Sequence, residues 1–87
     1  MSTIKKKITP EYFNFVASGK KNFEVRLADF DIKEGDILAL EEWDPETKQY
    51  TGKKIEKEAT YIYKFNLNDF GQAEQIKKDG LFVIRLD

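Results

Sequence analysis

Apolar and polar residues alternate along this chain in patterns that predict one well-defined helix among several short strands. Thr9 is a favourable N-cap residue and Pro10 suits the first helical position, so the helix is predicted to begin there. Gly19 is predicted to end it, because glycine enters the left-handed conformation at little cost. The helical spacing of the polar residues leaves a broad stripe that we expect to be buried, formed by Tyr12, Phe13, Phe15 and Val16.

Several segments around this helix have the composition and alternation of β-strands. Residues 2–8 contain few apolar side chains that can face inward, which is typical of an edge strand. Residues 53–65 have apolar side chains on both faces in their second half, as expected in a curved sheet or barrel. The predicted strands comprise residues 2–8, 22–27, 36–43, 53–65 and 80–86.

The segments between these strands carry turn signals. Residues 28–36 form a predicted loop with two isolated apolar side chains, and residues 44–52 form a turn opened by Asp-Pro and closed by glycine. Within residues 66–79 we predict a short helical excursion, because the pattern beginning at Asp69 resembles a capping box. Gly71 weakens the first turn of any helix placed there.

Composition narrows the possible classes of protein. The 87 residues make a single domain, residues 1–87, with no internal repeat or linker. The absence of cysteine and histidine argues against a metal site, a cofactor held by such ligands and serine–histidine chemistry. Fifteen basic residues balance sixteen acidic ones, so no net field attracts the chain to a polyanion or a membrane. Without a long apolar run or a signal-peptide pattern, we expect a cytoplasmic soluble protein.

The stretch "GKKNFEVRL", residues 19–27, holds the candidate chemistry. As a strand, it would place three apolar side chains on one face and Glu24 and Arg26 on the other, directly after Lys21. Two interpretations are open. The structural one is a solvated strand face with an ion pair. The functional one is a polar site whose guanidinium grips phosphate and whose carboxylate accepts hydrogen bonds from a base.

The same stretch fits the pattern glycine, any, lysine, any two, glutamate, any, arginine, and so resembles the ASCH domains of the PUA-like β-barrel superfamily. The segments "PEYFNFVASGKK", "KEGDILALEEWDP", "YTGKK" and "GLFVIRL" follow in the order of that family's helix, third strand, hairpin and last strand. The similarity extends over nearly the whole chain and is greatest to a small prokaryotic and phage-associated group of uncharacterised function. It implies an α+β fold: a small PUA-like β-barrel of about five strands with one main helix covering an opening.

The resemblance also implies a function. It predicts a cleft between helix and barrel, suited to RNA or a nucleotide, with Gly19, Lys21, Glu24 and Arg26 at its rim. Some ASCH relatives instead hydrolyse the amide of acetylated cytidine with a lysine, a hydroxyl nucleophile and an acid. Lys21 matches that lysine, but Glu24 stands where those relatives have the hydroxyl, and no acid is assigned within residues 66–79. We therefore expect a module that binds RNA, a nucleotide or a nucleoside, with a hydrolase and a protein-interaction domain as alternatives.

Three further residues are candidates for the ligand site, each with an ordinary structural alternative. Lys20 follows a helix end, where the helix dipole alone favours a cation. Trp43 ends a strand beside a turn, where it can stack on a base or pack in the core. Arg85, among the apolar residues of the last predicted strand, can join the site or cap the barrel. Tyr61 and Tyr63 are expected to be mainly core residues.

Overall fold

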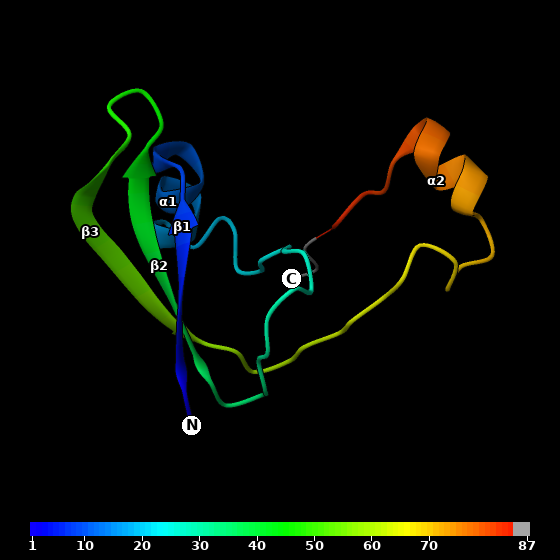
Figure 1. Ribbon diagram of the computed structural model, residues 1–87, viewed down its shortest axis with the longest axis horizontal. Helices are drawn as coiled ribbons and strands as arrows, with labels where there is room; N and C mark the ends of the chain where they lie inside the picture. The colour runs from blue at the N-terminus through cyan, green and yellow to red at the C-terminus, as the bar shows by residue number, and fades with distance from the viewer. Residues whose placement is uncertain (85–87) are drawn as a thin grey trace.

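The computed structural model describes residues 1–84 and is a small α+β fold with an open three-stranded sheet and two helices (Figure 1). The α+β class predicted from the sequence is thereby confirmed. Arg85 and the end of the last predicted strand lie outside the described residues. In chain order the elements are β1 (Thr3–Ile8), α1 (Pro10–Ala17), β2 (Ile37–Asp44), β3 (Gln49–Glu58) and α2 (Ala73–Asp79).

The sheet has the strand order β1-β2-β3. Strand β1 pairs parallel to β2, with Ile8 opposite Glu42, and β2 pairs antiparallel to β3. Parallel neighbours need a long crossover, which here contains α1. The helix packs on β2 and lies against one face of the sheet (Figure 1). The prediction that the first strand is an edge strand is confirmed.

A small core joins α1 to the sheet. Phe13 and Val16 are buried on the helix, as the stripe predicted, and they meet Ile8 of β1 and Leu40 of β2. Tyr12 belongs to the same predicted stripe, yet 51% of its surface is exposed. The stripe is narrower than expected because a helix of eight residues presents only one side to a single sheet face.

The ends of α1 are where the sequence places them. Thr9 has an extended N-cap conformation and Pro10 is the first helical residue. The helix stops at Ala17, and Gly19 has a φ of +80°, which an L-residue with a side chain rarely adopts. The predicted glycine stop is thus confirmed, and it sets the direction in which the next segment leaves the helix.

Three predicted stretches are not strands in the structure: residues 22–27, the second half of the predicted strand 53–65 (residues 59–65), and the described part of the last predicted strand, residues 80–84. Instead the third strand of the sheet is formed earlier, from Gln49, because the turn before it is tight. Asp44 accepts hydrogen bonds from the backbone amides of Glu46 and Lys48, which close the turn within four residues. Strand β3 therefore takes up residues that the sequence assigned to a longer turn.

Several large apolar side chains are left exposed by this arrangement. Tyr61 is 75% and Tyr63 60% exposed, which differs from the expectation that both are core residues. Val25 and Leu27, on the other predicted strand, are exposed as well. The physical reason is that neither segment has a sheet partner within residues 1–84 against which these side chains could pack.

The helical excursion predicted within residues 66–79 is present as α2, which lies apart from the sheet (Figure 1). It begins only at Ala73, after Gly71 with a φ of +66°. Asp69 does not cap this helix; its carboxylate accepts a 2.7 Å hydrogen bond from the backbone amide of Asn66. The acid therefore stabilises the turn before the helix.

Asp36 holds the start of β1 to the loop that precedes β2. Its two carboxylate oxygens accept 2.9 Å hydrogen bonds from the backbone amides of Ser2 and Lys33, and only 8% of the residue is exposed. These hydrogen bonds, that from Ser2 first, lower the pKa of Asp36 below its usual value, because they stabilise the ionised form. The ionised carboxylate thus contributes to the parallel pairing of β1 with β2.

We predict that Asp36 makes the free energy of unfolding depend on pH in the acid range. Because its pKa is lower in the folded state, its contribution is present above the unfolded-state pKa of about 4 and is lost as pH falls through the folded-state pKa. Asp36→Asn should lower stability at pH 7 and remove this part of the acid-induced loss. Urea denaturation at pH 7 and at several acid pH values measures both effects. Asp31→Asn, at an exposed acid, is the matched control; equal pH profiles for Asp36→Asn and the unsubstituted protein would contradict the assignment.

Candidate functional site

The glycine stop of α1 positions Lys21. After Gly19 the chain folds back, so that the backbone amide of Lys21 donates a 2.9 Å hydrogen bond to the carbonyl of Phe15 in the helix. The Lys21 side chain then lies between two aromatic rings, with Nζ 5.5 Å from the ring centroid of Tyr12 and 5.6 Å from that of Phe23. Local backbone chemistry therefore places this cation beside the helix.

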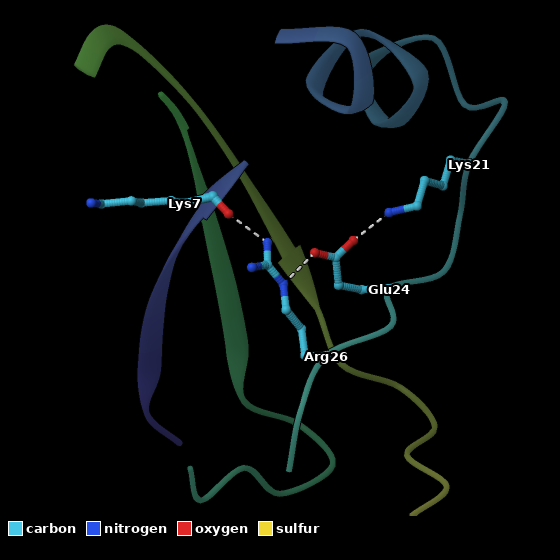
Figure 2. A network of polar contacts seen from close by, with 4 residues as sticks. All are labelled: Lys7, Lys21, Glu24 and Arg26. Atoms are coloured by element: carbon cyan, nitrogen blue, oxygen red, sulfur yellow. Dashed lines mark hydrogen bonds and ion pairs between the residues drawn. The ribbon is translucent and has the colours of Figure 1, made fainter. Parts of the chain in front are cut away.

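Glu24 joins two cations with one carboxylate. Lys21 Nζ donates to Oε1 at 2.5 Å, and Arg26 Nε donates to Oε2 at 2.7 Å (Figure 2). The three side chains are 19%, 16% and 30% exposed, in the order Lys21, Glu24, Arg26. Hydrogen bonds between ionised groups are stronger than neutral ones, and partial burial reduces their screening by salt. The residues that the motif singled out thus form one connected network.

Arg26 connects this network to the sheet. Its Nη2 donates a 2.6 Å hydrogen bond to the backbone carbonyl of Lys7, near the end of β1, while the Lys7 side chain points away (Figure 2). Within residues 1–84, Nη1 of Arg26 makes no hydrogen bond. The guanidinium is therefore held on two sides and retains donors for a further acceptor. With two cations and one anion, the three side chains leave a surplus of one positive charge.

A cleft of about 410 Å³ opens beside the network, within the size range of small-ligand sites. It lies where the end of β1, the first turn of α1 and the segment after the helix meet. Its lining residues are Lys7, Ile8, Thr9, Tyr12, Lys21, Glu24, Val25 and Arg26. A second, larger hollow of about 980 Å³ shares Lys21, Glu24, Val25 and Arg26 and continues along residues 57–65.

The other candidates from the sequence lie elsewhere. Lys20 and Trp43 line neither hollow. The ring of Trp43 packs edge-on against Tyr50 at 4.9 Å between centroids, and Lys7 Nζ lies 3.9 Å from the Trp43 ring centroid. Arg85 lies outside the described residues.

Tyr12 and Lys7 line the cleft but were not among the sequence candidates. Tyr12 carried a weak signal, since tyrosine is the one member of its helical stripe with a polar end and so suits a boundary position. Lys7 takes part through its backbone carbonyl, which every residue possesses. No sequence pattern could have identified that contact.

A family described as "Domain of unknown function (DUF3850)" matches residues 3–83. The chain belongs to the DUF3850 family. No curated protein matches it. The description of the DUF3850 family names no activity.

Among residues 1–84 there is no cluster of three or more acidic residues placed to hold a metal ion. No helix in the same range is both long and apolar enough to span a bilayer.

We predict that Glu24→Gln lowers the free energy of unfolding by about 1–2 kcal/mol at low ionic strength, because it weakens two charge-assisted hydrogen bonds and leaves two cations close together. Added salt should narrow this difference, since it screens both the attraction in the native protein and the repulsion in the variant. Urea denaturation at two salt concentrations measures it.

The matched control is Glu46→Gln, at an exposed turn residue that makes no ion pair within the described part of the chain. It should change stability little at either salt concentration. If the difference in unfolding free energy between Glu24→Gln and the unsubstituted protein stays constant or widens with added salt, an electrostatic origin is contradicted.

Proposed function

We propose that this DUF3850 domain is a binding module for RNA or a nucleotide, with the ligand seated in the cleft beside Glu24. The observation that carries the proposal is the convergence of Lys21 and Arg26 on one carboxylate at that cleft, with a surplus positive charge and unused guanidinium donors. A guanidinium suits a phosphate, because its planar donors match two phosphate oxygens. The carboxylate complements it by accepting hydrogen bonds from an amino group of a base.

The proposal includes the finer fold that the ASCH resemblance implies. The motif residues Lys21, Glu24 and Arg26 lie together, as a shared ligand site requires. Apolar side chains in residues 22–27 and 59–65 are exposed along the larger hollow beside β2, and those in residues 81–84 are exposed as well, which supports a PUA-like barrel of about five strands in which these segments add to the sheet. Slow amide hydrogen exchange in these three segments would support the barrel, and rapid exchange in all three would contradict it.

Single-stranded RNA or a nucleotide should bind the unsubstituted protein, and Lys21→Ala and Arg26→Ala should each weaken binding about tenfold or more, because each removes a cation from the cleft. The matched control is Lys77→Ala. Lys77 pairs with Glu74 at the same sequence separation as Lys21 with Glu24, but on α2. Fluorescence anisotropy or calorimetric titration measures the dissociation constants.

Binding should depend only modestly on salt. For single strands the slope of log affinity against log salt is roughly 0.7 per neutralised phosphate, and a nearly neutral chain with one cationic cleft contacts few phosphates. A fall of several decades between two moderate ionic strengths would reveal an extended basic surface and contradict recognition at this cleft. Equal losses of affinity for Lys77→Ala and Arg26→Ala would likewise contradict recognition at this cleft.

A hydrolase acting on a modified nucleoside, of the acetylated-cytidine type, is the second candidate, favoured by the 2.5 Å contact between Lys21 and Glu24. Against it, Glu24 stands where the acetylated-cytidine hydrolases have the hydroxyl nucleophile, and both of its oxygens accept hydrogen bonds from cations. The chain also has no histidine or cysteine to supply a nucleophile.

We therefore expect no release of acetate when the purified protein is incubated with acetylated cytidine. Chromatography of the nucleoside and an acetate assay both detect turnover. Acetate release that disappears in Glu24→Gln or Lys21→Ala, while the variants stay folded, would establish the hydrolase instead of the binding module.

A further inference from the structure

The ring of Tyr12 lines the cleft. Among the described residues it is the single aromatic side chain in the cleft lining, and half of its surface is exposed although it lies on the helix that carries the core. A large aromatic side chain left in contact with water beside a polar network is typical of a binding surface, because its flat face offers contact area at little entropic cost. Trp43, the other aromatic candidate, is already packed against Tyr50.

The polar groups lie within reach of this ring. Lys21 Nζ is 5.5 Å from the Tyr12 ring centroid and 2.5 Å from Glu24 Oε1, so the ring and the carboxylate lie within the span of one nucleotide. Each Glu24 oxygen accepts one hydrogen bond from a cation, and a carboxylate oxygen can accept two. Together, Tyr12 offers a stacking face, Glu24 an acceptor and Arg26 its unused cationic donors.

Resting on the proposed function, we propose that Tyr12 stacks on the base of a single nucleotide unit while Glu24 accepts from an amino group of that base and Arg26 holds its phosphate. The class of ligand is therefore a nucleotide whose base carries an exocyclic amino group. Cytosine, adenine and guanine offer this donor, whereas uracil does not.

The test compares Tyr12→Leu, which removes the ring, with Tyr12→Phe, which keeps it. CMP, AMP, GMP and UMP are titrated into the full chain, with ribose 5-phosphate as the probe that has a phosphate but no base. Tyr12→Leu should weaken binding of the amino-bearing nucleotides by roughly five- to hundredfold, as for loss of one base stack, and leave ribose 5-phosphate unaffected. Tyr12→Phe should stay within about twofold of the unsubstituted protein. UMP should bind more weakly than CMP.

A spectroscopic measurement separates stacking from a merely structural role of the tyrosine. In NMR spectra, base protons of bound CMP should move upfield with the unsubstituted protein and with Tyr12→Phe, and not with Tyr12→Leu. The inference is overturned if Tyr12→Leu binds nucleotides within twofold, or weakens ribose 5-phosphate equally, or if the base protons do not move.

The measurements distinguish stacking by Tyr12 from nucleotide binding as such. If no nucleotide or RNA binds the unsubstituted protein, both are overturned. If nucleotides bind and Arg26→Ala loses them while Tyr12→Leu does not, the cleft is the site but Tyr12 does not stack on the base. Equal affinities for UMP and CMP overturn the reading of an amino group by Glu24.

Discussion

The Glu24 carboxylate is the contact on which the geometry of the cleft depends. It holds Lys21, at the end of the helix, to Arg26, and Arg26 in turn bonds to the carbonyl of Lys7 in the sheet. One acid thus orders the segment after the helix, which Arg26 joins to β1 and the Lys21 backbone amide joins to α1. Because two of its partners are charged and partly buried, the link is stronger than an ordinary surface ion pair.

The same arrangement explains why the site should discriminate among ligands more than it attracts them. Glu24 balances one of the two positive charges of Lys21 and Arg26, and the chain as a whole carries a net charge of −1. A long-range field to draw in a polyanion is therefore absent. What remains is a fixed set of donors and acceptors, which binds most tightly a ligand that matches all of them at once.

Much of the framework around the cleft could be predicted from local sequence signals. Thr9, Pro10 and Gly19 define the helix through backbone preferences that act within a few residues. The short first strand and the apolar strand at residues 37–44 follow from their composition. The segments at 22–27 and 59–65 were not predictable in the same way, because alternation shows that a segment can be a strand but not which partner it pairs with.

By itself the sequence determined that the lysine, glutamate and arginine follow a glycine helix stop, and hence that they lie near one another. Only the tertiary structure decided that Arg26 bonds to the Lys7 carbonyl and that Tyr12, not Trp43, faces the cleft. The physical reason is that backbone carbonyls have no residue identity. The exposure of an aromatic ring likewise depends on which neighbours cover it, and that is set by packing between segments distant in the chain.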